Sequence, residues 1–251
     1  MRPRFYAPKA NISGENIVLP DYEGRHLRQV LRLTPGAEIA LFDGNGHEFS
    51  GIVQDITGSS VVVRVGSQCS PPALEPGLAI TVASAVLKSH SMDNVIKYST
   101  LFGISAIQPI VSVRSEVSLS SLQQGKRMER WRRIAVSAAK QCGGAVVPSI
   151  LSPCNFNELS KNLTEVLSSG SPQLMLVEPS SSRDCLSISE LEQPGNREAA
   201  LIIGPEGGWA TEEIEKGSTL FKLVTLGSRT FRAEVAPLVV LASLFTAWKE
   251  F

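Results

Sequence analysis

Cysteine and histidine are scarce in this chain, which carries four cysteines and three histidines. The cysteines form no Cys-x-x-Cys pair and the histidines are scattered, so neither a metal site nor a disulfide framework is expected. Long apolar runs are missing too, because the longest, around residues 237–248, is too short to cross a bilayer. No apolar signal core follows the N-terminal arginines. We therefore expect a soluble, cytoplasmic protein whose cysteines are reduced and mostly buried.

An excess of charge of one sign is also absent, since 24 Lys and Arg balance 24 Asp and Glu. The whole chain is thus not an obvious polyanion binder. The distribution is uneven, however: residues 1–35 hold six basic side chains against three acidic ones, and residues 123–140 hold six against Glu129. A single cluster of this kind is usually a solvated helix face, whereas two in a balanced chain favour an RNA-facing surface. The candidate RNA contacts are Arg2, Arg4, Arg25, Arg28, Arg32, Arg130 and Arg133.

The most informative segment is an apolar run that ends in a turn rich in glycine. Residues 199–203 predict a buried strand, residues 204–208 read Gly-Pro-Glu-Gly-Gly, and a helix is expected from Thr211 as its N-cap. Glycine takes a positive φ cheaply, so such turns bring the backbone close to a ligand at the carboxyl end of a strand. The acids Glu206, Glu212 and Glu213 would repel a phosphate, and no P-loop or Gly-x-Gly-x-x-Gly pattern is present. The turn favours a neutral or cationic ligand; a turn that merely caps the helix is the alternative.

A second charged segment precedes the last apolar helix. Residues 226–234 read Leu-Gly-Ser-Arg-Thr-Phe-Arg-Ala-Glu and follow a short apolar run. Charges beside a buried helix are costly unless they are paired or used. Glu234 paired with Arg229 or Arg232 would anchor the helix, which is one interpretation. The other is a ligand site shared with the glycine-rich turn, because both segments leave the same kind of sheet edge.

Residues 1–72 predict a small β-rich domain. Asp-Gly-Asn-Gly at 43–46 is a strong hairpin turn signal. A helix is expected over residues 23–33, with Arg25, Arg28 and Arg32 on one face that can follow a phosphate backbone. The strands expected around these features are 39–42, 49–53 and 60–65.

Residues 73–251 alternate between strand and helix patterns after a linker at about 68–76. The expected strands are 78–87, 104–111, 173–177, 199–203 and 224–226. The expected helices are 92–102, 127–141, 156–167 with Asn155 as its cap, one after Thr211, and 237–248. This rhythm indicates an α/β domain with a mostly parallel sheet covered by helices on both faces.

The turn at 204–208, followed by Leu-Gly-x-Arg-x-x-Arg-x-Glu at 226–234, resembles the E-type 16S ribosomal RNA methyltransferases of the SPOUT class. The resemblance runs nearly end to end. It includes residues 1–6 and 26–33, and Gln-Cys-Gly at 141–143 followed by Val147-Pro148. It implies a PUA-like RNA-binding β-barrel at 1–72, then a SPOUT domain at 73–251 with a C-terminal trefoil knot. It also implies a homodimer.

The resemblance further implies methylation, by S-adenosylmethionine (SAM), of N3 of a uridine in the decoding region of 16S rRNA in the small ribosomal subunit. The loops after the last three strands would bind the cofactor through Val177, Glu178, Ile203, Gly204, Pro205, Glu206, Gly207, Gly208, Leu226, Gly227, Ser228 and Phe231. Uracil N3 must lose its proton, so a positive group near the base would stabilise the anion. Arg232 is the first candidate and Arg229 the second, with Glu234 positioning one of them. Glu206 would orient an arginine or bind a cofactor hydroxyl.

The target base must also be exposed, so stacking residues would help. Trp209 and Phe231 are candidates, although core packing is the favoured role for both.

The chain departs from the family pattern at several positions. Tyr98 and Leu101 replace a Lys and a Glu, Gly144 replaces the arginine after Gln-Cys-Gly, and Ser228 and Val235 replace a Pro and a Thr. These departures leave three hypotheses. One is the uridine-N3 methyltransferase, and the second is a non-catalytic RNA-binding or ribosome-assembly protein with the same fold. The third is a small-molecule enzyme that binds a nucleotide cofactor at the turn, against which the basic β-rich domain counts.

Overall fold

The computed structural model describes residues 2–8, 12, 15–123, 126–179 and 185–250. Their contacts divide the chain into a small unit, Met1–Glu75 with Val136–Val147, and a large unit, Pro76–Ala135 with Pro148–Phe251. The segment Val136–Val147 therefore returns to the small unit from within the later part of the chain. The division predicted after residue 72 stays a prediction.

The small unit is built on one five-stranded sheet with the order β1-β3-β4-β5-β2. Its strands are β1 (Arg4–Tyr6), β2 (Asn16–Val18), β3 (Glu38–Phe42), β4 (Glu48–Thr57) and β5 (Ser60–Cys69). β1 pairs with β3 in parallel, and the other neighbours are antiparallel. Alternating residues such as Ile39, Leu41, Val61 and Val63 point into one core, because successive strand side chains face opposite ways.

The predicted hairpin is confirmed, with β3 and β4 pairing across the Asp-Gly-Asn-Gly turn. Asp43 Oδ1 accepts hydrogen bonds from the amides of Asn45 at 2.7 Å and His47 at 3.1 Å. Burial by itself would raise the pKa of Asp43, but these amide bonds and the His47 ring hold that pKa below its ordinary value. The ionised carboxylate thus fastens the turn.

The helix predicted over residues 23–33 is confirmed up to Val30 and wrong beyond it. The α-helix α1 (Asp21–Arg25) widens into the π-helix η2 (His26–Val30), in which the amide of Leu31 donates to the carbonyl of His26 at 3.1 Å. Arg32 lies beyond the helix with a left-handed φ of 52°. The wider turn changes the angular spacing of side chains, so the three arginines do not form the predicted helical face.

The large unit contains one parallel sheet with the order β11-β13-β10-β12-β6-β7-β8, in which β9 also pairs with β7. Its strands are β6 (Ala79–Ala85), β7 (Ala106–Val111), β8 (Ser149–Ile150), β9 (Cys154–Asn155), β10 (Gln173–Leu176), β11 (Leu186–Ser187), β12 (Glu198–Ile203) and β13 (Lys222–Thr225). Every strand pair of this sheet in the described residues is parallel. The α/β class with a mostly parallel sheet is confirmed.

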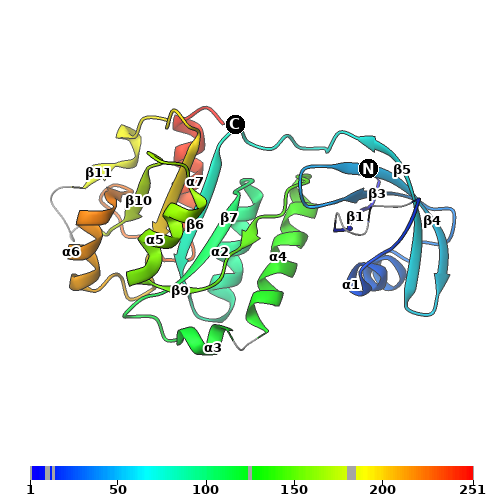
Figure 1. The fold of residues 1–251 in the computed structure, drawn as a ribbon, viewed down its shortest axis with the longest axis horizontal. Helices are drawn as coiled ribbons and strands as arrows, with labels where there is room; N and C mark the ends of the chain where they lie inside the picture. Colours follow the sequence, from blue (N-terminus) through cyan, green and yellow to red (C-terminus); the bar gives the residue numbers. More distant parts are fainter. Residues whose placement is uncertain (1, 9–11, 13–14, 124–125, 180–184, 251) are drawn as a thin grey trace. The chain divides into compact units, whose positions relative to one another are not determined.

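Helices pack on both faces of this sheet, and Figure 1 shows α5 in front of the strands and α7 behind them. The helices are α2 (Ser89–Leu101), α3 (Leu119–Gln123), α4 (Arg127–Cys142), α5 (Phe156–Val166), the 3₁₀ helix η3 (Ile188–Glu190), α6 (Thr211–Leu220) and α7 (Ala236–Ala247). On one face Phe156 of α5 contacts the rings of Trp209 and Phe221. α2 packs against α7, and there the ring centroids of Phe102 and Phe245 lie 5.4 Å apart.

The chain order of the last strands brings three loops to one sheet edge. β13 lies between β10 and β11, both of which precede it in the chain. Leu176 pairs with Val224, and Met175 with Ile202, so β10, β12 and β13 end at a common carboxyl edge. The predicted trefoil knot stays a prediction.

The cysteines are less buried than expected. Cys154 is buried, Cys142 and Cys185 are half-buried, and Cys69 is exposed, so "mostly buried" is wrong. No disulfide joins these four residues, all of which lie in the described part of the chain. Burial raises the pKa of the Cys154 thiol to about 11, so it stays protonated at neutral pH.

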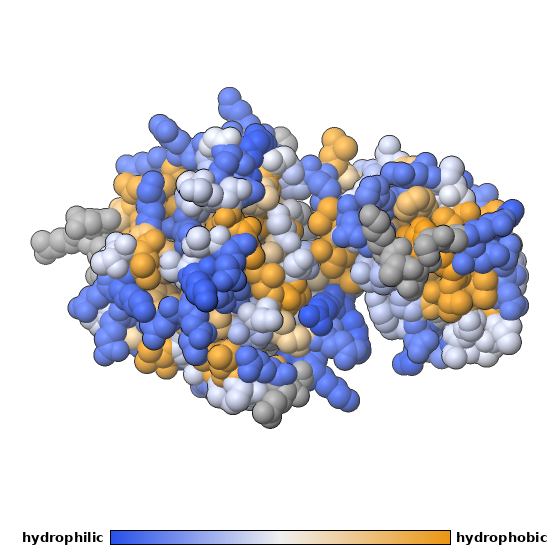
Figure 2. Space-filling view, in the orientation of Figure 1, coloured by the Kyte–Doolittle hydropathy of each residue, from blue (hydrophilic) through white to orange (hydrophobic). Residues whose placement is uncertain are grey.

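Hydrophilic and hydrophobic side chains are interspersed on the face of the large unit shown in Figure 2. Among the described helices, none has both the length and the apolar character needed to cross a membrane. The same residues contain no group of His, Cys, Asp and Glu that could hold a metal ion.

Candidate active site

A cavity of about 500 Å³ opens at the carboxyl edge shared by β10, β12 and β13. It is lined by the residues that follow β10, by the glycine turn (residues 204–208) after β12, and by the arginine loop (residues 226–234) after β13. Ligands of open parallel sheets bind outside the carboxyl ends of the strands, where this cavity lies. The two segments that the sequence singled out therefore meet at one site.

The structure places most of the predicted cofactor and catalytic residues in the cavity wall. Those residues are Val177, Glu178, Ile203, Gly204, Pro205, Glu206, Gly208, Leu226, Arg229, Phe231, Arg232 and Glu234. Gly207, Gly227 and Ser228 belong to the same loops but do not line the cavity. Ser91, near the start of α2, also lines it and was not predicted, because its strand-to-helix connection carries no glycine-rich signal.

The glycine turn needs glycine for two different reasons. A Cβ on Gly204 would lie 2.9 Å from Cε2 of Trp209, which leaves no room for a side chain. Gly208 has a φ of 68°, in the left-handed region that glycine adopts without strain. Trp209 is 7% exposed and its Nε1 donates to the carbonyl of Leu176 at 2.8 Å. Trp209 therefore packs in the core and holds the turn against β10, as the favoured interpretation had it.

The helix after the turn begins differently from the prediction. Thr211 is its first helical residue, and Ala210 takes the N-cap position. The amide of Ala210 donates to Glu213 Oε2 at 3.0 Å, so a carboxylate one turn along satisfies the helix start. The threonine cap is wrong because a side chain from the third helical position replaces it.

Glu206 is held by a backbone group. Its Oε1 accepts a hydrogen bond from the amide of Lys88 at 3.0 Å, while Glu206 also lines the cavity. No arginine in the described part of the chain forms an ion pair with it. The structure thus shows Glu206 linking the glycine turn to the connection between β6 and α2.

The arginine loop leaves its charged groups unpaired. Arg229, Phe231 and Arg232 are exposed and Glu234 is half-buried. The core packing favoured for Phe231 is therefore wrong, because its ring is 37% exposed and lines the cavity. Within the residues that the structure describes, neither arginine forms an ion pair with Glu234 or any other acid. The anchoring ion pair that the sequence allowed is therefore not formed there. Two cationic groups face the cavity without a protein partner, an arrangement suited to an electron-rich ligand.

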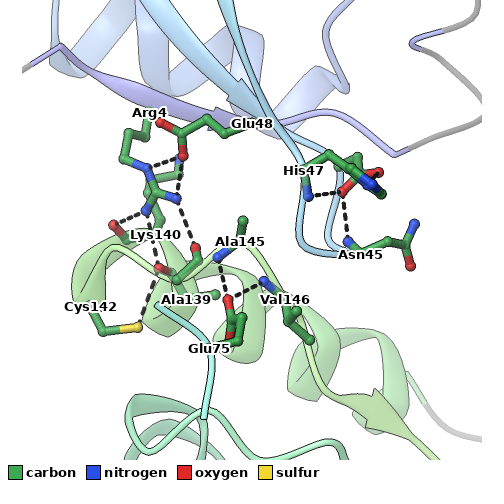
Figure 3. A network of polar contacts seen from close by, with 12 residues as sticks. Arg4, Asn45, His47, Glu48, Glu75, Ala139, Lys140, Cys142, Ala145 and Val146 are labelled. Atoms are coloured by element: carbon green, nitrogen blue, oxygen red, sulfur yellow. Dashed lines mark hydrogen bonds and ion pairs between the residues drawn. The ribbon is translucent and has the colours of Figure 1, made fainter. Parts of the chain in front are cut away.

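The basic side chains predicted to bind RNA fall into two groups. Arg4 is 7% exposed, and its guanidinium donates to Glu48 Oε2 at 2.7 and 2.9 Å. It also donates to the carbonyls of Ala139 and Lys140, as Figure 3 shows, and to the carbonyl of Gly144 at 2.8 Å. Arg4 is thus buried and fully paired inside the small unit, so its predicted contact with RNA is wrong.

The other predicted arginines reach the surface. Arg25 and Arg32 are exposed, and Arg28 donates to the carbonyl of Gly58 at 2.6 Å. The exposed arginines with an acidic neighbour are Arg2 with Glu38, Arg130 with Asp93 and Arg133 with Glu129. The pairs of Arg2 and Arg133 are exposed on both sides and therefore weak, whereas the Asp93 side chain in the third pair is only 15% exposed. Binding of RNA by these arginines stays a prediction.

Two departures from the family pattern, Ser228 and Val235, belong to or directly follow the arginine loop, whereas Tyr98, Leu101 and Gly144 do not line the cavity. Tyr98 and Leu101 are half-buried in α2, and neither lines the cavity. Gly144 lies in the small unit, where a Cβ would be 3.2 Å from Glu75 Oε1. The carboxylate of Glu75 accepts from the amides of Ala145 and Val146 at 2.7 and 2.9 Å (Figure 3). A side chain at position 144 would thus meet a carboxylate that is bound to backbone amides.

Known proteins share this fold. The sequence profile of an RNA methyltransferase domain matches residues 74–245, and that of an RNA methyltransferase PUA domain matches residues 19–66. The fold is that of SPOUT-class methyltransferases with an N-terminal PUA domain. This chain belongs to the ribosomal RNA small subunit methyltransferase E family.

Three relatives illustrate the match. The structure of a methyltransferase from Legionella pneumophila with the bound cofactor SAM has a TM-score of 0.87 and 29% identity, covering 99% of this chain and 98% of that one. A ribosomal RNA small subunit methyltransferase E from Neisseria gonorrhoeae bound to S-adenosyl methionine has a TM-score of 0.85 and 31% identity, with the same coverage of 99% and 98%. A protein of that name from Synechocystis is 28% identical over 97% of this chain and 77% of its own length.

Proposed function

We propose that this protein uses SAM to methylate N3 of a uridine in the decoding region of 16S rRNA. The observation that carries the proposal is the cavity in which the glycine turn faces two unpaired arginines, Arg229 and Arg232. The glycine turn on one side of the cavity would bind the cofactor, and the two arginines on the other would bind an anionic base. This arrangement suits the transfer of a methyl group between them. Membership of the family supports the same reaction.

The lining of the cavity supports SAM as the cofactor. Gly204 and Gly208 keep the turn free of side chains where the backbone must approach a ligand. No backbone amide of residues 227–234 donates to a carbonyl elsewhere in the described chain, so these donors are free to hold an adenine or a carboxylate. Glu178, Glu206 and Glu234 line the same cavity and would favour the positive charges of SAM. The bound cofactor supplies an activated methyl group.

The residues of the chain then have to align the base and stabilise its anion. Arg232 would lie against the uracil oxygens and stabilise the charge that forms when N3 loses its proton. Arg229 is the second candidate for this role. Glu234 lines the cavity beside both arginines and would hold one of them in position. Phe231, 37% exposed, would contact the cofactor.

The proposed partner is the small ribosomal subunit, so the protein would act in the cytoplasm. Arg2, Arg25, Arg28, Arg32, Arg130 and Arg133 would contact RNA phosphates. We also propose a homodimer, in which the exposed Leu238 on the apolar helix α7 would contribute to the interface. Because Tyr98, Leu101 and Gly144 lie outside the cavity, the site gives no support to the non-catalytic alternative.

The deciding experiment is methyl transfer from labelled SAM to small ribosomal subunits that lack their natural modifications. The expected product is N3-methyluridine, identified by the mass of the released nucleoside together with its co-elution with an authentic N3-methyluridine standard, since other methyluridines have the same mass. RNA binding should also weaken with salt, with a log–log slope of about −0.7 to −0.9 per phosphate contacted. Normal RNA binding without transfer to any nucleotide would contradict the proposal and favour a ribosome-assembly role.

A further inference from the structure

Arg114 contacts the glycine turn without lining the cavity. Its Nη1 donates to the carbonyl of Gly207 at 2.7 Å, and its Cδ lies 3.6 Å from the position of a Cβ on Gly207. The same Nη1 lies 3.9 Å from the position of a Cβ on Gly208, which does line the cavity. The peptide between the two glycines is therefore flanked by Arg114 and the cavity.

The segment that carries Arg114 is itself well fixed. It follows β7 and is closed into a turn by Ser112 and Ser115. Their hydroxyl oxygens lie 3.0 Å apart, and the amide of Ser115 donates to the carbonyl of Ser112 at 3.0 Å. The amide of Val113 donates to Glu213 Oε1 at 3.0 Å, and Glu213 is only 4% exposed. A buried carboxylate with two backbone donors is a firm anchor, so Arg114 extends from a rigid base.

Two neighbouring connections thus hold the glycine turn from outside. β12, β6 and β7 are adjacent in the sheet, so the segments that follow them lie side by side. After β6, the amide of Lys88 binds Glu206, and after β7, Arg114 binds the carbonyl of Gly207. Glycine has the largest conformational freedom to lose on ordering, so an unrestrained Gly-Gly pair would sample many paths.

We propose that Arg114 is a positioning residue for the cofactor site, an inference that rests on the proposed use of SAM. By holding the carbonyl of Gly207, it keeps the next residue, Gly208, in the path that forms the cavity wall. Without it, only a fraction of molecules would present the binding-competent turn. The apparent affinity falls by that fraction. Transfer from already bound SAM would be little affected.

The test is the dissociation constant of SAM, measured by calorimetry on the full chain, for the wild type, Arg114→Met and Arg114→Lys. We expect about tenfold weaker binding for Arg114→Met, because a hydrogen bond from a charged group is lost. Arg114→Lys keeps the charge and should stay within about threefold of the wild type. The kcat at saturating SAM and the urea midpoint should not change, since Arg114 is exposed. Arg64→Met, the same substitution in the small unit, should bind SAM normally.

Two results would overturn the inference while the proposed function stands. One is a wild type and an Arg114→Met variant that bind SAM equally. The other is weaker SAM binding by Arg114→Met that is accompanied by a lower urea midpoint and is equally large in Arg114→Lys. A residue with a merely structural role would behave in this way. A wild-type chain that fails to bind SAM at all would instead overturn the proposed function and the inference together.

Discussion

The glycine turn and the arginine loop leave β12 and β13, the strands on either side of β10, but their backbones are held differently. In the glycine turn, Trp209 binds β10, Glu206 binds Lys88, and the amide of Gly208 donates to the carbonyl of Pro205 at 3.0 Å. The arginine loop has no comparable restraint on its amides in the described chain. One segment is a rigid wall, and the other offers unused donors and cations.

The difference indicates a division of roles within one cavity. A preorganised wall lowers the entropy that a cofactor must remove on binding. Unpaired arginines cost little at an exposed site and remain available for a substrate that carries negative charge. Preorganisation of the cofactor site should therefore depend on the glycine turn, while the arginine loop adds its backbone amides to the cofactor and its two arginines to the rate of transfer.

The largest expected effect is on the rate. Arg232→Ala removes a charged donor from the proposed anion site, so kcat should fall by about 10²–10³-fold. SAM affinity should change little, because the cofactor wall stays intact. Single-turnover methylation of the small subunit and calorimetry with SAM separate the two effects. Arg229→Ala, in the same loop, should give a smaller loss of rate. An Arg232→Ala enzyme as fast as the wild type would refute the division of roles.

A substitution in the rigid wall should act on binding and stability. Gly204→Ala places a methyl group 2.9 Å from the Trp209 ring, and overpacking of this kind costs about 1–3 kcal/mol. We expect a lower urea midpoint and weaker SAM binding. Gly207→Ala is the matched control, because its nearest neighbour would be 3.6 Å away, an ordinary contact. Equal midpoints for the two variants would show that the turn is not tightly packed.

The smallest effect on stability should come from a substitution in the arginine loop. Gly227 has a φ of 92° but no atom within 4 Å of an added Cβ, so Gly227→Ala meets only backbone strain. The strain is of order 1–2 kcal/mol in a rigid segment, and an unrestrained loop can relax part of it. Urea unfolding should thus show a smaller loss than Gly204→Ala. A larger loss would mean that this loop is as rigid as the glycine turn.

The sequence predicted the elements that carry long apolar patterns. The strands ending at Ile203 and Val111 and the helices beginning at Arg127 and Phe156 lie where expected, because hydrophobic periodicity is a local signal. The strands β8, β9 and β11 have two residues each, too few to show a period.

Contacts between distant positions were beyond the reach of the sequence. Arg4 was assigned to RNA because nothing near it reveals that its partners are Glu48 and carbonyls some 135 residues away. Arg114 was overlooked for the same reason, since its partner Gly207 is 93 residues away. In contrast, the cavity residues were found because glycine spacing and unpaired charge are visible along the chain. The helix predicted over 23–33 is wrong at Arg32 because the helix propensities of residues do not indicate where an α-helix widens into a π-helix.

The composition of the small unit limits how this protein can be dissected. A polypeptide truncated after residue 72 would lack the carbonyls of Ala139, Lys140 and Gly144. Arg4 would keep Glu48 but lose its other acceptors, and a buried donor without an acceptor is costly. Such a fragment should be unstable alone and should recover when a synthetic peptide spanning Val136–Val147 is supplied in trans. The first 72 codons would then not encode an autonomous module, and recombination that exchanged them between homologues would have to include the distant segment Val136–Val147.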